Sequence, residues 1–141
     1  MKKRNFVIVI VIFLILDLIS KWLVTGKQIN LINNFLSINF VKNSGALFGL
    51  FKGYNIIFIL LSIIVLIIII YMLNEFGYNF GFAVIFAGIL GNFIDRIYFG
   101  YVRDFIDFNF WPVFNLADVF LVGGVLYLIY YLYFNKFKEK Q

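Results

Sequence analysis

The sequence predicts an all-α membrane protein that crosses the bilayer with four helices. Hydrophobic residues make up 64% of the chain, whereas they make up roughly 45–50% of a soluble domain. Four apolar stretches approach the ~20 residues that a helix needs to cross ~30 Å of hydrocarbon. They cover about residues 6–24, 54–73, 80–98 and 114–134. We expect residues 1–141 to form a single membrane domain, because the chain has no room for a second one.

Composition restricts the chemistry that the chain can perform. It contains no histidine and no cysteine, which excludes histidine metal ligands, thiol nucleophiles and serine–histidine pairs. We therefore expect no metal and no cofactor. The net charge of +5 comes from basic residues too scattered for a nucleic-acid-binding surface. Carboxylates remain as the groups available for hydrolysis.

The basic residues at the two ends predict the orientation in the membrane. They are Lys2, Lys3, Arg4, Lys136, Lys138 and Lys140. Four helices place both termini on one side, and cytoplasmic segments carry an excess of Lys and Arg. We therefore expect cytoplasmic termini, against the evidence of three lysines in the opposite first loop. Those three are Lys27, Lys42 and Lys52.

Two outer connections are expected to carry irregular structure. Residues 25–53 are too long for a simple turn, and the run 43–49 is punctuated by glycine, which indicates short strands and tight turns. Residues 99–113 are dense in aromatic side chains. Such side chains concentrate at the membrane interface, so this segment is predicted to be an interfacial loop.

The charged side chains within the first and third spans are predicted mainly to support the structure by pairing with one another. Asp17 and Lys21 are spaced i, i+4, which suits a helical ion pair, although they could also lie near a site. Asp95 and Arg96 follow a stripe of small residues typical of close helix packing. An acid in such a segment should turn inward and pair with a cation. Arg96 could instead bind a substrate carbonyl or a lipid phosphate.

Asp104 and Asp118 are the remaining acids near the outer boundary. Asn115 and Asp118 share a face at the start of the fourth span, and Asp104 lies between the third span and the aromatic loop. Asp118 could be a carboxylate favoured by the helix dipole, and Asp104 a solvated charge beside Arg103. If the two converge, they could share a proton and hydrolyse an amide. Proton-coupled transport and a non-catalytic assembly role stay open on the residues alone.

Five segments in this order resemble the lipoprotein signal peptidase (signal peptidase II) family. They are Asp17-Leu18-Ile19-Ser20-Lys21, Asn43-Ser44-Gly45-Ala46-Leu47-Phe48-Gly49, Gly88-Ile89-Leu90-Gly91-Asn92-Phe93-Ile94-Asp95-Arg96, Val102-Arg103-Asp104-Phe105 and Phe114-Asn115-Leu116-Ala117-Asp118. Each segment alone is weak, but five in register are specific.

The resemblance implies a four-helix aspartyl endopeptidase of the bacterial cytoplasmic membrane, with a small extracytoplasmic β-sheet cradle at about residues 28–50. Its substrate would be a prolipoprotein, cut before a cysteine that carries diacylglycerol, near the outer face of the bilayer. By position, Asp104 and Asp118 would be catalytic. Asn43, Asn92, Arg96 and Asn115 would bind substrate, and Asp17, Lys21, Gly45 and Asp95 would support the site. We expect membrane lipid as a partner and a monomeric enzyme.

Overall fold

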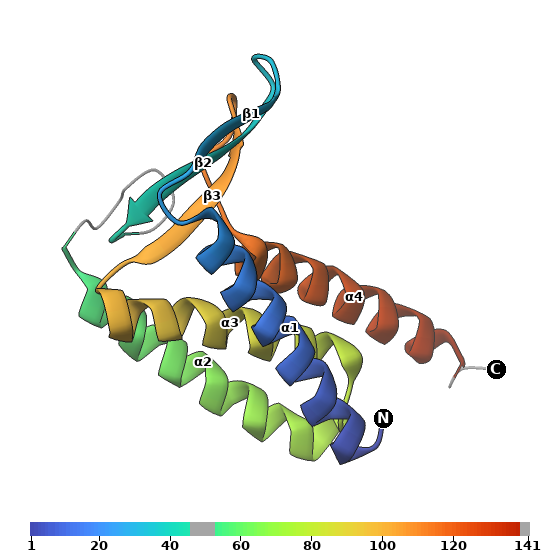
Figure 1. Ribbon diagram of the computed structural model, residues 1–141. Helices are drawn as coiled ribbons and strands as arrows, with labels where there is room; N and C mark the ends of the chain where they lie inside the picture. The colour runs from blue at the N-terminus through green and yellow to red at the C-terminus, as the bar shows by residue number, and fades with distance from the viewer. Residues whose placement is uncertain (46–52, 139–141) are drawn as a thin grey trace.

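The protein consists of four helices and a three-stranded sheet (Figure 1). This computed structural model describes residues 1–45 and 53–138, with side chains described as far as residue 134. Part of the predicted outer-loop motif, residues 46–49, lies outside the described residues. The elements are α1 (Lys3–Val24), β1 (Gln28–Ile32), β2 (Leu36–Asn43), α2 (Asn55–Phe76), α3 (Phe80–Phe99), β3 (Val102–Phe108) and α4 (Leu116–Lys138). The predicted fold class is confirmed.

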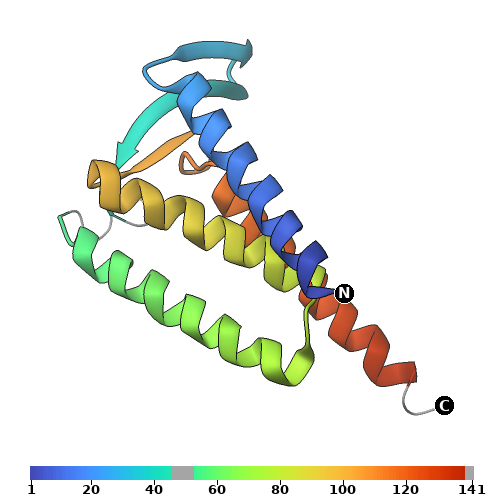
Figure 2. The ribbon, with the colours of Figure 1, turned by 60° about the horizontal axis from the view of Figure 1, so that its bottom comes forward.

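Helix α3 is the centre of the bundle and packs against α1, α2 and α4 (Figure 2). Glycine allows its backbone to come close to α4, because a Cβ atom on Gly88 would lie 2.6 Å from the carbonyl oxygen of Ala117. The side chain of Asn79 accepts a hydrogen bond from the amide of Gly81 and caps the start of α3. Gly100 ends the helix in the left-handed conformation, with φ of 76°.

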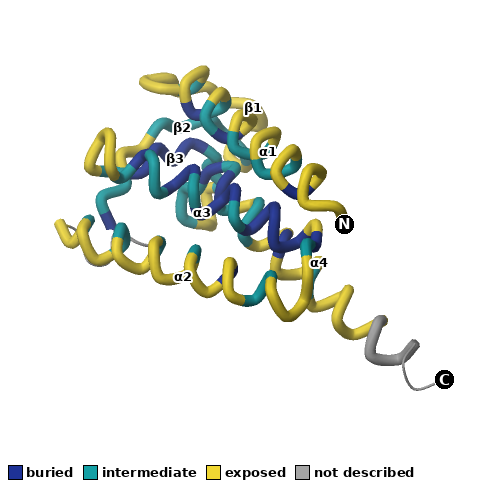
Figure 3. The backbone as a smooth tube through the Cα atoms, turned by 90° about the horizontal axis from the view of Figure 1, so that it is seen from below, coloured by how far each residue is buried: buried dark blue, intermediate teal, exposed yellow. Residues whose placement is uncertain are grey.

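Helix α2 differs from α3 in that its surface is largely exposed, as the yellow tube in Figure 3 shows. Ile69 is its one buried residue. Such a surface is stable when lipid rather than water surrounds it, because a helix satisfies its own backbone hydrogen bonds. All four helices are long and apolar enough to cross a membrane. The chain is therefore a membrane protein.

The sheet lies beyond one end of the helices, and the N-terminus and the last described turn of α4 lie toward the opposite end (Figures 1 and 2). Its strands are antiparallel in the order β1-β2-β3. Residues 99–113 thus contain a paired strand, where the sequence predicts an interfacial loop. The aromatic composition of this segment did not reveal β3, because its pairing with β2 joins residues 59 to 72 positions apart.

Candidate active site

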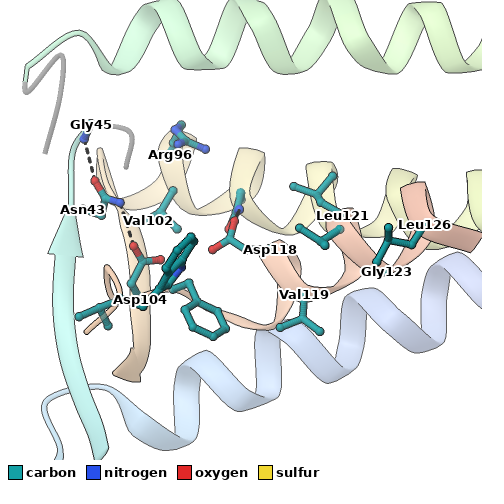
Figure 4. A pocket seen from close by; sticks show the side chains of 15 residues that line it. Asn43, Gly45, Arg96, Val102, Asp104, Asp118, Val119, Leu121, Gly123 and Leu126 are labelled. Carbon is teal, nitrogen blue, oxygen red and sulfur yellow. Dashed lines mark hydrogen bonds between the residues drawn. The ribbon is translucent and has the colours of Figure 1, made fainter. Parts of the chain in front are cut away.

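The carboxylates of Asp104 and Asp118 face one pocket from two different elements (Figure 4). Asp104 belongs to β3, and Asp118 lies in the first turn of α4. The pocket has a volume of about 670 Å³. Asn43, Gly45, Asn92 and Arg96 also line it. Six of the predicted site residues therefore share one cavity, although they come from segments far apart in the chain.

The start of α4 determines where Asp118 points. The amide of Asp118 donates a hydrogen bond to Asn115 Oδ1 at 3.2 Å, and the amide of Asn115 donates one to Asp118 Oδ2 at 3.1 Å. This reciprocal pair is a capping box, in which the residue before the helix and the third residue of the helix satisfy each other. The carboxylate of Asp118 is thus fixed by the same hydrogen bonds that begin the helix.

Asn115 also connects the two aspartates. Its Nδ2 atom donates to Asp104 Oδ1 at 2.6 Å, while its backbone amide donates to Asp118. The Asn115 side chain has no solvent exposure and lies behind the pocket wall. Asn115 thus contacts both acids, whereas the family resemblance implies a substrate-binding residue.

A bulge in the sheet brings Asn43 to the same face as Asp104. Ile38 pairs with Ile106, but Val41 pairs with Asp104, so two residues of β2 lie opposite one residue of β3. Without this extra residue, Asn43 would share a face with Arg103 instead. Asn43 Nδ2 donates to Asp104 Oδ2 at 2.8 Å, and its Oδ1 atom accepts from the amide of Gly45 at 3.0 Å (Figure 4).

Asp104 is buried, with 3% of its surface exposed. The pKa of its carboxyl is raised from 3.8 to about 6, chiefly because burial removes the carboxylate from water. The charge of Asp118 raises the pKa as well, whereas the hydrogen bonds from Asn43 and Asn115 lower it. The interpretation of Asp104 as a solvated interfacial charge is therefore wrong. Asp104 can bind and release a proton near neutral pH.

Behind this pair lies a cluster of fully buried charges on α1 and α3. Lys21 Nζ lies 2.8 Å from Asp17 Oδ2 and 3.4 Å from Asp95 Oδ2. Asp17 Oδ1 accepts a hydrogen bond from the amide of Ala117 at 3.0 Å. The cluster thereby holds the amide end of α4 against α1, which favours the supporting roles that the sequence predicts for these residues.

The second cation beside Asp95 is Arg103, which the sequence analysis did not pair with it. Arg103 Nη2 lies 2.7 Å from Asp95 Oδ1, and its backbone amide donates to Asp95 Oδ2 at 3.0 Å. The sequence neighbour Arg96 is not the partner. Successive side chains of a strand point to opposite faces, so Arg103 reaches Asp95 while Asp104 reaches the pocket.

Arg96 is available for a ligand. Its guanidinium lies 5.0 Å from the ring centre of Phe58 and lines the pocket. Within residues 1–45 and 53–134 it makes no ion pair. A half-buried guanidinium whose donors have no hydrogen-bond acceptor among these described residues suits a carbonyl or another polar group of a ligand.

The pocket continues as an apolar groove along α4, away from the sheet (Figure 4). No role was predicted for its residues on α4. Among them, Val119, Val122 and Leu126 are spaced three and four positions apart on one helical face, which is the signal that the sequence offers for the groove. The apolar lining consists of Val102, Trp111, Val113, Phe114, Val119, Leu121, Val122, Gly123 and Leu126. In the part of the chain that the structure describes, no group of three acidic side chains is arranged to hold a metal ion.

Residues 9–134 match the family model for Signal peptidase (SPase) II. The chain belongs to the signal peptidase II family. A signal peptidase II relative, the lipoprotein signal peptidase of Caldicellulosiruptor bescii, is 43% identical over 107 residues, or 74% of this chain and 71% of the relative. That of Clostridioides difficile is 37% identical and covers 96% of this chain and 99% of the relative. Membership in this family implies a protease.

Two solved structures of bacterial membrane enzymes share the fold of this signal peptidase II chain. The first has a TM-score of 0.85 and 33% sequence identity, and the match covers 95% of this chain and 90% of that one. The second has a TM-score of 0.81 and 35% identity, with 92% and 93% covered. The family resemblance drawn from the five segments is thus confirmed.

Proposed function

We propose that this chain is an aspartic endopeptidase that removes the signal peptide from diacylglyceryl-modified bacterial prolipoproteins. The observation that carries the proposal is the pair of carboxylates, Asp104 and Asp118, held by Asn115 at the mouth of an apolar groove. Family membership supplies the substrate class, because the relatives are named lipoprotein signal peptidases.

In the proposed reaction, one carboxylate accepts a proton from a water molecule as the water oxygen attacks the scissile carbonyl carbon. The other carboxylate, which holds a proton, donates it to the carbonyl oxygen. The first carboxylate then passes the proton it took from water to the amide nitrogen of the lipidated cysteine. The C–N bond before that cysteine breaks as the other carboxylate takes its proton back from the hydroxyl group, which releases a carboxylic acid and an amine. Two acids can divide these roles because like charges held close together do not both ionise easily. The amide donors of Asn43, Asn92 and Asn115 keep the carboxylates in place during these transfers.

The groove along α4 fits the apolar part of this substrate. Its lining from Val119 to Leu126 lies within a membrane-length helix, so a signal peptide can reach it within the bilayer. Arg96 is suited to bind a backbone carbonyl of the peptide near the cleavage point. Anchoring enzyme and substrate in one membrane raises their effective concentration, so peptide contacts need not supply all the binding energy.

The proposed orientation has both termini in the cytoplasm and the sheet at the outer surface. Basic residues cluster at both ends of the chain, and the N-terminus and the last described turn of α4 lie away from the sheet (Figures 1 and 2). The proposed enzyme works as a monomer. A reporter fused to the C-terminus tests the orientation, and a periplasmic or extracellular signal would contradict it.

The decisive experiment compares Asp104→Asn and Asp118→Asn with the parent, using a diacylglyceryl-modified prolipoprotein whose cleavage is followed by gel shift. We expect each variant to lose on the order of 10²–10⁴-fold in rate, the range of general acid–base catalysis. Asp107→Asn is the matched control, since Asp107 lies on the same strand and does not line the pocket. A prolipoprotein that lacks the lipid on its cysteine tests the substrate class.

The alternatives make different predictions in this assay. An assembly factor needs neither aspartate, so folded variants that process substrate at the parent rate would show that the acid pair is not catalytic. The transporter alternative gains no support from the family match.

A further inference from the structure

A single side-chain amide connects the buried ammonium of Lys21 to Asp118. Lys21 Nζ donates to Asn92 Oδ1 at 2.9 Å, and Asn92 Nδ2 donates to Asp118 Oδ1 at 2.9 Å. Lys21 has no solvent exposure and does not line the pocket. Asn92 and Asp118 do line it. A charge on α1 therefore reaches the pocket wall through one residue of α3.

Two hydrogen-bond donors on the side away from the pocket fix the orientation of the Asn92 side-chain amide. Asn92 Oδ1 accepts a second hydrogen bond, from Asn115 Nδ2 at 3.1 Å. An ammonium group has donors and no acceptor. Turning the amide over would place its own N–H groups against Lys21 and Asn115, and each of these two donor groups would lose one acceptor in a buried site. The N–H group of Asn92 thus stays directed at Asp118.

We propose that Lys21 is a positioning residue for the aspartate pair. Through Asn92 it keeps one oxygen of Asp118 occupied by an N–H donor, so that the remaining lone pairs of the carboxylate face the water and the substrate. This inference rests on the proposed peptidase function. Lys21 acts through Asn92 and contacts neither the substrate nor the attacking water.

The competing interpretation gives Lys21 a purely structural role. Its ammonium also pairs with Asp17 at 2.8 Å and with Asp95 at 3.4 Å, and the loss of a partner from a buried ion pair destabilises a fold. A structural role lowers the amount of folded enzyme and leaves the turnover of each folded molecule intact. A positioning role lowers kcat itself, with little effect on KM.

The test measures kcat and KM per folded enzyme in detergent for Lys21→Met, Asn92→Ala and the double variant. We expect Lys21→Met to lower kcat about 100-fold and to change KM by less than about threefold. Both residues act in one chain of hydrogen bonds, so their effects should not multiply. We expect the kcat of the double variant to be no more than about threefold below that of the less active single variant.

Asp17→Asn is the matched control, because it disturbs the same ion pair without touching Asn92. Its side chain keeps an oxygen that can accept the hydrogen bond from Ala117. We expect a lower midpoint of thermal unfolding but a kcat within about fivefold of the parent. If Lys21→Met does not fold, Lys21→Gln takes its place, with an expected loss in kcat of about tenfold.

Two results would overturn the inference. One is a kcat for folded Lys21→Met as high as that of Asp17→Asn, and the other is a double variant whose loss is the product of the single losses. Asp104→Asn and Asp118→Asn in the same assay separate this inference from the proposed function. If those variants are inactive while Lys21→Met keeps its kcat, only the positioning role is wrong; if they are active, the acid pair itself is wrong.

Discussion

Two pairs of carboxylates, buried except for the partly buried Asp118, lie side by side in this protein and are held in different ways. Asp17 and Asp95 meet the cations of Lys21 and Arg103 at ion-pair distance. Asp104 and Asp118 receive only neutral N–H groups and, across residues 1–45 and 53–134, have no salt-bridge partner. An ion pair cancels charge, whereas amide donors hold a carboxylate without cancelling it. The first pair therefore suits structure and the second suits proton transfer.

The largest expected effect tests the structural half of this comparison. Asp95→Asn leaves Arg103 and Lys21 with one carboxylate fewer in a buried cluster. We expect a loss of about 3–5 kcal/mol in the free energy of unfolding, measured by denaturation in detergent. Asp104→Asn in the same experiment should cost far less, because it removes no cation's partner. Equal losses for the two variants would erase the distinction between the pairs.

The second prediction concerns pH. The pKa of Asp104 is about 6 in the folded protein and 3.8 ordinarily. The folded state therefore binds this proton more tightly, so this group stabilises the fold at low pH and loses that contribution as pH rises from about 4 to 6. The difference between these two pKa values corresponds to about 3 kcal/mol in the free energy of unfolding. The free energy of unfolding, measured from pH 4 to 8, should decrease with pH in the parent through this contribution, which Asp104→Asn should lack. If the free energies of the two proteins vary with pH in parallel, Asp104 does not titrate in this way.

Two adjacent glycines on α4 provide a smaller and sharper test of the pocket. A Cβ atom on Gly123 would meet nothing within 4 Å, whereas one on Gly124 would lie 2.6 Å from Ile85 Cγ1 and 3.0 Å from the carbonyl oxygen of Gly81. Gly123→Leu should fill the groove, raise KM about tenfold and leave stability unchanged. Gly124→Ala should cost about 1–3 kcal/mol of stability through overpacking. If Gly123→Leu cleaves the lipidated prolipoprotein with parental KM, the groove does not bind the substrate.

The smallest effect is expected at Asp107, the next acid along β3. It accepts a hydrogen bond from Asn39 at 2.9 Å and is only partly buried. Asp107→Asn should change the free energy of unfolding by less than about 0.5 kcal/mol and leave the cleavage rate unaltered. If Asp107→Asn instead lost as much activity as Asp104→Asn, lining the pocket would not be what distinguishes a catalytic acid from the other acid on β3.

Much of the fold follows from composition alone. Apolar stretches of membrane length predict the four helices, because lipid excludes most other structures for such segments. The third strand was missed, since the residues of β3 carry no clear alternation and gain their order by pairing with β2. A local pattern cannot reveal a partner that lies far along the chain.

The site shows a similar division. Asn115 and Asp118 were expected to share a helix face, and the capping box between them follows from that spacing. The partner of Asp95 was not predictable from its neighbours, because the adjacent Arg96 points to the pocket and Arg103 arrives on another element. The apolar wall of α4 was also missed, since in a membrane helix apolar residues face both lipid and groove.

The hydrogen bond from the amide of Ala117 to Asp17 joins residues 100 positions apart. During synthesis the ribosome delivers α1 to the membrane well before α4. Asp17 and Lys21 can neutralise each other in that interval, because they lie one helical turn apart. The amide end of α4, with Asn115 and Asp118, joins them only when the last helix inserts. A partly translated chain thus lacks its second pocket carboxylate, and on the proposed mechanism it has no peptidase activity until insertion is complete.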